Sequence, residues 1–293
     1  GELDEEFVYE SRKGDAFLLG TFGWKIAEIK KDEVIVEPTS PERARVPFWK
    51  GEIKGRPLKT SLAFGRILRE LSAAGEEGRL REALQELGLD ENASKATAGF
   101  LERQMEATDV LPDDRTIVVE HFCDHTGSHQ MMVHSLFGRQ INAPLALLLQ
   151  QAACRKTGLN VGCVDEENGL LLYPYGEDEL PEGLLYELSP ENARPVLEAI
   201  LPQTSLFNIT FRYNAARALM MGMRRNGRQP LWLQRIRSAD MLDGIIAKNS
   251  HPLVRETRRE CVEDQWDIAG LEYVLNGIRS GMITVHEVHV EIP

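Results

Sequence analysis

Residues 115–150 read RTIVVEHFCDHTGSHQMMVHSLFGRQINAPLALLLQ, and this stretch decides the fold of the chain. Its segments RTIVVEHF and HQMMVHS are rich in strand-forming residues, and the turn-like sequence CDHTG separates them, which predicts a β-hairpin. The segment INAPLALLLQQAACRKTG has an almost continuous apolar face, which is typical of a deeply buried helix. A hairpin followed by a buried helix indicates a sheet that is covered by helices.

The sequence before this stretch predicts strands first and helices afterwards. Residues 1–58 contain the strand-like segments AFLLGTFGWKIAEIK and EVIVEP, which glycine and proline interrupt. Residues 60–110 predict three helices with apolar residues at helical spacing. The two expected buried faces are Ala63, Ile67, Leu71 and Ala74, and then Leu80, Leu84 and Leu87. We therefore expect a β-rich lobe with a helical extension over residues 1–110.

The hairpin and the buried helix belong to a second predicted lobe, residues 111–293. The sequence after residue 150 adds further strands and helices to it. The segments NVGCV and GLLLYP flank the turn DEENG, and the tail MITVHEVHVEI alternates as a strand does. Helices are expected near 189–200, 204–225, 238–248, 252–264 and 267–280. Two groups of strands, each followed by helices, predict an α+β fold and not a doubly wound sheet.

Charge is distributed unevenly along the chain. The totals of 34 basic and 46 acidic residues give a net charge of −12, which argues against a global attraction to nucleic acid. Residues 157–193 contain nine acids and no Lys or Arg, whereas residues 199–239 contain seven arginines and no acid. These arginines either pair with the acidic segment or form a local phosphate-binding surface, because the planar guanidinium suits phosphate. The nucleic-acid-binding candidates are Arg224, Arg228, Arg235 and Arg237. Arg235 and Arg237 share a face only if LWLQRIR is extended.

A second basic stretch, ERARVPFWKGEIKGRPLK at residues 42–59, surrounds two aromatic rings with six cations. Binding of a single strand requires cations that follow the phosphates and a ring that stacks on a base. We predict that Trp49 stacks on a base and that Lys50 and Arg56 contact phosphates. In the alternative interpretation, Phe48 and Trp49 are both core residues.

Several kinds of catalytic motif are absent from the sequence. It has no P-loop, no G-x-G-x-x-G after a strand, no G-x-S-x-G and no H-E-x-x-H, so the chain alone is not expected to hydrolyse a nucleotide. Four scattered cysteines predict a reduced, cytoplasmic protein, and no apolar run is long enough to span a membrane.

A histidine-rich hairpin raises the question of a metal site. His121, Cys123, His125, His129 and His134 are close in sequence, and alternate positions of a strand would present zinc ligands on one side. No C-x-x-C accompanies them. We therefore predict no metal, no catalytic residue and no cofactor in this chain, and a zinc-dependent enzyme is the alternative.

Five segments together resemble the region that follows the motor in the large helicase-related (Lhr) family. They are LDEEFVYE with GDAFLLGTFGWKIAEI, VPFWKGEIKGRP, the stretch 115–150, PLWLQRIRSADML, and HPLVRETRRECVEDQWDIAGLEYVL. The resemblance covers nearly the whole chain. VPFW-x-GE with GRP, and HS-x-FG with INAPLAL, are specific in combination. Trp49 falls on the family's aromatic residue in the FW turn.

The resemblance implies a DEAD/DEAH-helicase-associated domain of a superfamily 2, ATP-dependent 3′-to-5′ helicase that acts in DNA repair. The implied partners are single-stranded DNA or an RNA–DNA hybrid, together with the RecA-like motor and winged-helix domains of the same polypeptide. ATP and Mg²⁺ would act in that motor. The second lobe is implied to resemble type III secretion chaperones. No ATP site, DExH box or winged helix is found in the sequence, so coupled unwinding by this chain alone is not expected. A protein-interaction or self-association module is the alternative.

Overall fold

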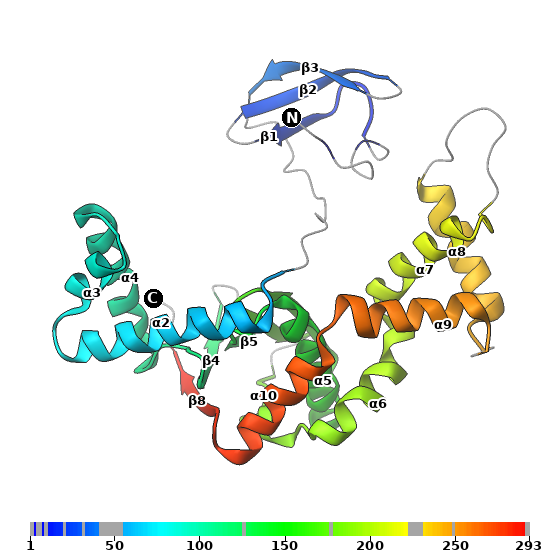
Figure 1. Cartoon of the computed structure of the whole chain (residues 1–293). Coiled ribbons are helices and arrows are strands. Elements are labelled where there is room, and N and C mark those ends of the chain that lie inside the picture. Colours follow the sequence, from blue (N-terminus) through cyan, green and yellow to red (C-terminus); the bar gives the residue numbers. More distant parts are fainter. Residues whose placement is uncertain are drawn as a thin grey trace. The chain divides into compact units, whose positions relative to one another are not determined.

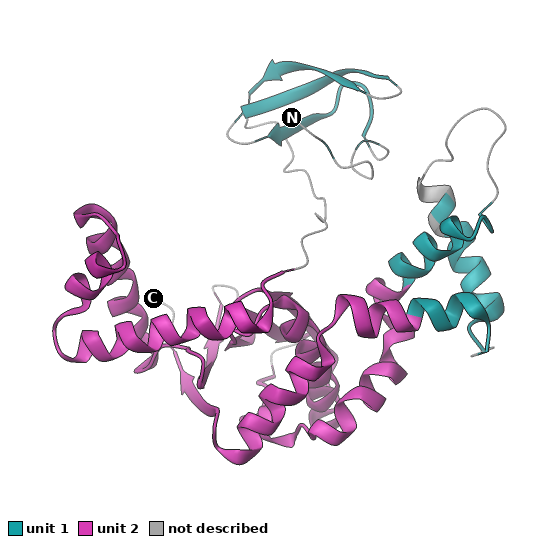
Figure 2. Ribbon diagram, viewed as in Figure 1, with its two compact units in different colours: residues 1–53, 208–257 teal, residues 54–207, 258–293 magenta. Residues whose placement is uncertain are grey.

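The computed structural model describes residues 3, 8, 11–19, 22–30, 33–40, 55–124, 127–175, 178–221, 231–247 and 250–290. The chain divides into two compact units, which Figure 2 colours separately. The first unit comprises residues 1–53 and 208–257, and the second comprises residues 54–207 and 258–293. These contact-based units group the helices after residue 58 with the second unit and residues 208–257 with the first, and the predicted lobes 1–110 and 111–293 stay a prediction.

The first unit contains a three-stranded antiparallel sheet and most of three helices. The strands are β1 (Ala16–Leu19), β2 (Phe22–Ile29) and β3 (Val34–Thr39), in the order β1-β2-β3. The helices are α7 (Ser205–Arg217), α8 (Leu231–Ile245) and α9 (Pro252–Arg259). Asn214 Nδ2 donates a 3.1 Å hydrogen bond to Thr257 Oγ1, which links α7 to α9.

A five-stranded mixed sheet forms the centre of the second unit (Figure 1). Its strands are β4 (Thr116–Cys123), β5 (His129–His134), β6 (Val161–Glu166), β7 (Gly169–Pro174) and β8 (Thr284–His289). They follow the order β6-β7-β5-β4-β8, and β8 pairs with β4 in parallel while the other neighbours are antiparallel. The predicted hairpin, the two following strands and the closing strand are thus confirmed in one sheet.

Helices α5, α6 and α10 pack together in the second unit. Helix α5 (Arg139–Thr157) contacts β6 and β7, and α6 (Pro190–Ile200) and α10 (Ile268–Ser280) contact α5. Helix α10 begins where the sequence predicts, because Asp267 Oδ1 accepts a 2.8 Å hydrogen bond from the Gly270 N–H. Short helical turns join these elements, namely η2 (Leu184–Glu187), η3 (Leu201–Gln203) and η4 (Glu260–Gln265).

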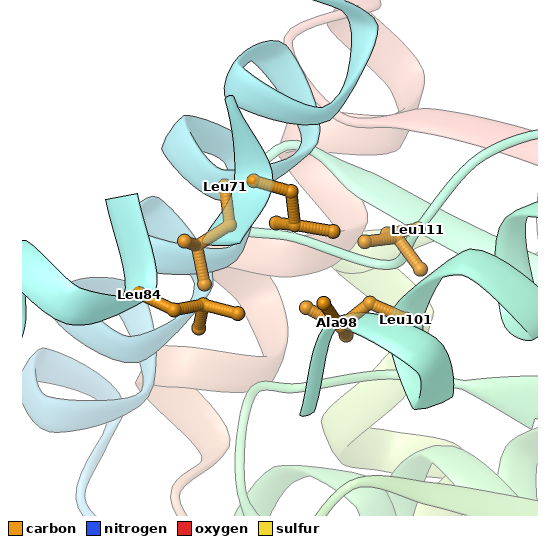
Figure 3. Packing of buried hydrophobic residues seen from close by; sticks show 6 residues of the cluster. Leu71, Leu84, Ala98, Leu101 and Leu111 are labelled. Atoms are coloured by element: carbon orange, nitrogen blue, oxygen red, sulfur yellow. The ribbon is translucent and has the colours of Figure 1, made fainter. Parts of the chain in front are cut away.

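Helices α2 (Leu58–Glu76), α3 (Leu80–Glu86) and α4 (Glu91–Thr108) form a separate hydrophobic cluster of the second unit. Figure 3 shows its side chains converging between the helices, and the cluster consists of Leu71, Leu80, Leu84, Ala98, Leu101 and Leu111.

Leu71 and Ala74 in the second half of α2 are buried as predicted, but the first half of the helix buries a different face from the predicted one. Ala63 and Ile67 are exposed, whereas Ser61 and Gly65 are buried. The cause is a close approach between backbones, since a Cβ on Gly65 would lie 2.5 Å from the backbone nitrogen of Asp114. Apolar spacing alone does not reveal a contact that small residues make.

The α+β class is confirmed, and the resemblance of the second lobe to secretion chaperones stays a prediction. The segment LWLQRIR is helical, because α8 begins at Leu231 and not near residue 238. Arg235 and Arg237 therefore do not share a face, since two residues turn a helix by about 200°.

Candidate functional site

Arg56 fastens the start of α2 to two turns of the second unit. Its backbone N–H donates to Glu167 Oε2 at 3.0 Å. Its Nη2 donates to the Leu136 carbonyl at 3.0 Å and to Asn168 Oδ1 at 2.9 Å, and its Nε donates to Ser61 Oγ at 3.0 Å. These bonds join the segment GRP, the turn between β5 and α5, and the turn between β6 and β7. We call this set of contacts the Arg56 junction.

Two glycines allow the segments of the Arg56 junction to approach one another. Gly55 has φ +70°, and a Cβ there would lie 2.5 Å from Glu167 Oε1. Gly138 has φ +94°, and a Cβ there would lie 2.4 Å from the Arg56 carbonyl oxygen. Other residues rarely adopt these backbone angles, and here a side chain would also collide. The glycines of GRP and HS-x-FG are thus explained by one contact region.

Asn142 supports the Arg56 junction from inside the protein. It is fully buried in α5, and its Nδ2 donates to the carbonyls of Ser135 at 2.8 Å and Glu166 at 2.9 Å. Its Oδ1 accepts from Ser135 Oγ at 2.7 Å. A buried amide that is satisfied in this way holds the two turns in one arrangement. The sequence signal for this residue was a lone amide within the apolar run INAPLALLL, and it was not used in predicting the site.

The predicted role of Arg56 as a phosphate contact does not match its surroundings. Three protein groups already accept hydrogen bonds from its Nε and Nη2, and the ring centroid of Phe64 lies 4.9 Å from its Cζ. The Glu167 carboxylate beside it would also repel a phosphate. In this arrangement Nε and Nη2 of Arg56 act within the fold, and its contact with the strand stays a prediction.

Four predicted strand-binding residues fall outside the described residues, and they are Trp49, Lys50, Arg224 and Arg228. Arg235 lies within α8, and the structure describes only its place in that helix. Arg237 is exposed on α8. The structure does not test whether these residues gather at one surface, so their role stays a prediction.

Two other arginines of the 199–239 segment contribute to the fold. Arg212 is 5% exposed, and its Cζ lies 5.3 Å from the ring centroid of Tyr213. Arg217 Nη2 donates to Asn214 Oδ1 at 2.7 Å. The acidic segment 157–193 forms ion pairs with cations outside the arginine segment, for example Asp165 with Arg139 at 2.8 Å and Glu187 with Lys156. The alternative in which the two segments neutralise each other gains no support from these pairs.

Histidines of the predicted hairpin lie on both faces of the sheet. His121 stacks on His289 of β8, with ring centroids 5.0 Å apart, and Cys123 Sγ lies 3.2 Å from His129 Nδ1. His134 lies on the opposite face, where its Nε2 is 3.0 Å from Glu120 Oε1.

Carboxylates surround the described histidines. Burial disfavours the charged form of Glu287, but His121 and the Gly183 N–H outweigh it, so the pKa of Glu287 lies below its ordinary value. An open cavity of about 570 Å³ borders this region, and its lining includes His121, His129, Asp124 and Glu179. The described part of its lining contains the acids Asp124 and Glu179 and no Lys or Arg, so the cavity does not favour a phosphate backbone. Among the described residues, no three His, Cys, Asp or Glu side chains form a metal-ligand group, and His125 lies outside them.

Comparison with known proteins places these features in a family. Residues 111–293 match the family model described as "DEAD/H associated", and residues 1–46 match "Large helicase-related protein, winged helix domain". The chain belongs to the DEAD/H-associated family of Lhr proteins. The second match corrects the expectation that the sequence contains nothing of the winged helix, because β1–β3 fall within residues 1–46. No helix among the described ones is long and apolar enough to cross a membrane.

Curated Lhr relatives align with the full length of this chain. It is 35% identical to "Lhr helicase/ probable uracil glycosylase" of Mycolicibacterium smegmatis and 34% identical to "Lhr helicase/uracil glycosylase" of Escherichia coli, and both alignments cover 100% of this chain. It is 28% identical to "ATP-dependent helicase Lhr-Core" of Methanothermobacter thermautotrophicus. The chain spans 20% and 19% of the two bacterial proteins and 34% of the archaeal one.

A solved structure of an Lhr protein has the same fold. It is the Mycobacterium smegmatis helicase Lhr bound to ssDNA and AMP-PNP, with a TM-score of 0.75 and 30% sequence identity. The match covers 85% of this chain and 32% of that one. The Lhr relationship inferred from scattered motifs is thus confirmed by sequence and by structure.

Proposed function

We propose that this chain is the accessory, strand-binding part of an ATP-dependent 3′-to-5′ Lhr helicase that acts in DNA repair. The observation that carries the proposal is the likeness, over 85% of the chain, to an Lhr helicase whose structure holds ssDNA and AMP-PNP. The motor would bind ATP and Mg²⁺, and this chain would hold and guide the strand. Its substrates would be single-stranded DNA or an RNA–DNA hybrid, and the cytoplasm would be its location.

The proposed contacts are base stacking by Trp49 and phosphate binding by Lys50 and by arginines 224, 228, 235 and 237. Trp49 lies in a segment that combines an aromatic ring with cations, which is the combination that single strands require. The arginines lie in a stretch of sequence without acids, and the planar guanidinium suits phosphate.

The proposal is tested by fluorescence anisotropy with a labelled single strand at several salt concentrations. We expect binding that weakens as salt rises, because counterions are released when arginines neutralise phosphates. Binding that does not depend on salt would argue against phosphate contacts. The measurement uses the complete helicase polypeptide, because the accessory part alone can bind too weakly to be detected.

A protein-interaction or self-association module is the second candidate. The observation that favours it is the position of β8 at the edge of its sheet, where a strand from a partner could add by main-chain hydrogen bonds. Anisotropy of Trp49→Ala in the complete polypeptide separates the two functions, because an interaction module would leave the strand affinity of this variant unchanged. Sedimentation of the same samples would then detect self-association.

A further inference from the structure

Helix α7 ends in a turn that carries an unexpected side chain. The Met220 N–H donates to the Ala215 carbonyl at 3.0 Å, and the Leu219 N–H donates to the Ala216 carbonyl, also at 3.0 Å. This pair of hydrogen bonds is a Schellman motif, which holds one residue in the left-handed backbone region and therefore favours glycine at that position. Here the residue is Leu219, with φ +58°.

Other described helices that end in the left-handed region carry residues suited to it. Helices α5 and α10 end with Gly158 at φ +73° and Gly281 at φ +75°, and α4 ends with Asp109 at φ +62°. Glycine has no Cβ and aspartate has a short polar side chain, whereas a leucine costs free energy in this region. Leu219 is 77% exposed, so burial does not offset this cost. Strained residues of this kind cluster at binding sites.

Further exposed side chains lie in the same part of α7. Tyr213 is 51% exposed, and Arg212 Cζ lies 5.3 Å from its ring centroid, an attraction that favours one position of the ring. Arg217 is exposed one helical turn after Tyr213, on the same side of the helix. Met220 is exposed directly after Leu219. We call Tyr213, Arg217, Leu219 and Met220 the α7 surface.

We propose that the α7 surface binds unpaired bases of a single strand, with one base stacked on Tyr213 and apolar contacts from Leu219 and Met220. This inference rests on the proposed function and adds to it a surface that the structure describes. Charge complementarity favours a nucleic acid as the occupant, because the surface lies within residues 199–239, which contain seven arginines and no acid. An exposed ring among cations is the combination that single strands require.

Contact with bases gives Leu219 a role that the fold does not give it. The faces of unstacked bases are apolar, and contact with an apolar side chain removes both surfaces from water. Such contacts involve no charge, so they strengthen binding without adding to its salt dependence. The expected effect of Tyr213 and Leu219 thereby differs from that of a phosphate-binding arginine.

Leu219→Gly separates a strand contact from a role in the fold. Glycine suits φ +58°, so the variant should melt at the same temperature as the unaltered polypeptide or at a higher one. Its strand affinity should fall about two- to fivefold, because the apolar contact is lost. Leu219→Asn, which also tolerates the left-handed region, should behave in the same way. Leu219→Met keeps an apolar side chain and should lose less affinity.

The deciding measurement is fluorescence anisotropy of a labelled single strand with the complete helicase polypeptide at several salt concentrations. Tyr213→Ala should weaken binding about fivefold or more, because the stacked base is lost. The slope of log affinity against log salt concentration should stay unchanged, because no phosphate contact is removed. Tyr213→Phe keeps the ring and should lose less affinity. The matched control is Tyr186→Ala, since Tyr186 is 60% exposed within the acidic segment 157–193, and its affinity should not change.

The outcomes distinguish this inference from the proposed function. If the unaltered polypeptide binds the strand and Tyr213→Ala and Leu219→Gly bind it equally well, the inference is wrong and the proposed function stands. Loss of self-association by these two variants in sedimentation, at unchanged strand affinity, would make the α7 surface a protein interface.

Two further results would overturn the inference. A lower melting temperature of Leu219→Gly would assign the leucine to the fold, and a reduced salt slope of Tyr213→Ala would assign its loss of affinity to the neighbouring arginines. If the unaltered polypeptide does not bind the strand, the proposed function fails and the inference fails with it.

Discussion

The backbone N–H of Arg56 donates to Glu167 Oε2 at 3.0 Å across 111 residues of sequence. This bond joins the segment GRP to the turn DEENG, and the glycine of HS-x-FG packs against the Arg56 carbonyl. Two of the motifs that carry the Lhr resemblance, GRP and HS-x-FG, therefore meet at one place in the second unit. Their combination has a structural reason, because each segment requires the others for close packing.

Replacement of a cluster leucine should destabilise the second unit. Leu84 is 2% exposed between α2, α3 and α4, so Leu84→Ala should cost about 2–5 kcal/mol through lost burial and a cavity. Leu87, which follows directly after α3, is 52% exposed, and Leu87→Ala should lower the free energy of unfolding by less than about 1 kcal/mol. Urea unfolding measures both, and equal losses would show that the cluster in Figure 3 is not a core.

Glu120 should contribute a pH-dependent part of the stability. His134 and Gln104 both lower the pKa of Glu120 below 4.5, and the Gln104 Nε2 bond is 2.8 Å long. A lowered pKa in the folded state gives stability that is present above about pH 4.5 and is lost as pH falls further. Glu120→Gln should therefore destabilise the protein by about 1 kcal/mol near pH 7.

The difference between Glu120→Gln and the unaltered protein should shrink below pH 4.5, where the carboxylate becomes protonated. Urea unfolding across the pH range is the measurement, with Glu82→Gln on the exposed surface of α3 as the matched control. A difference that is constant with pH would show that Glu120 acts through shape and not through charge.

Charge reversal at Arg237 tests the arginine segment at an exposed and described position. Arg237→Glu should weaken binding of all single strands alike. It should also reduce the slope of log affinity against log salt concentration by about one, the loss of one phosphate contact. Lys95→Glu on α4 is the control, because it reverses an exposed cation outside the arginine segment. If both variants weaken binding equally, the effect comes from net charge and Arg237 has no local role.

Alternation and apolar periodicity predicted most elements, because these patterns report local geometry. The hairpin of β4 and β5, the buried helix α5 and the Asp267 cap of α10 were all visible in this way. The start of α8 at Leu231 was missed, although Pro230 before it is a typical helix-start residue. Ile67 was misplaced because α2 uses small residues, not large ones, for its close contact with the chain near Asp114.

The candidate site was only partly predictable, because its cations have two possible uses. A lone arginine such as Arg56 looks the same in sequence whether it contacts a phosphate or forms hydrogen bonds within the protein. The acceptors that decide the matter, Leu136 and Asn168, lie 80 and 112 residues away. Periodicity carries no information about such distant pairs. The combined occurrence of GRP and HS-x-FG was the available signal.

The central claim is that Trp49 stacks on a base of the bound strand, and Trp49→Ala tests it most directly. Stacking contributes about 1–3 kcal/mol per base, so strand affinity should fall roughly 5- to 150-fold with little change in melting temperature. Trp266 is buried in the second unit, so Trp266→Ala should lower the melting temperature and leave affinity per folded molecule unchanged. A Trp49→Ala protein that melts early but binds the strand with unchanged affinity per folded molecule would contradict the account.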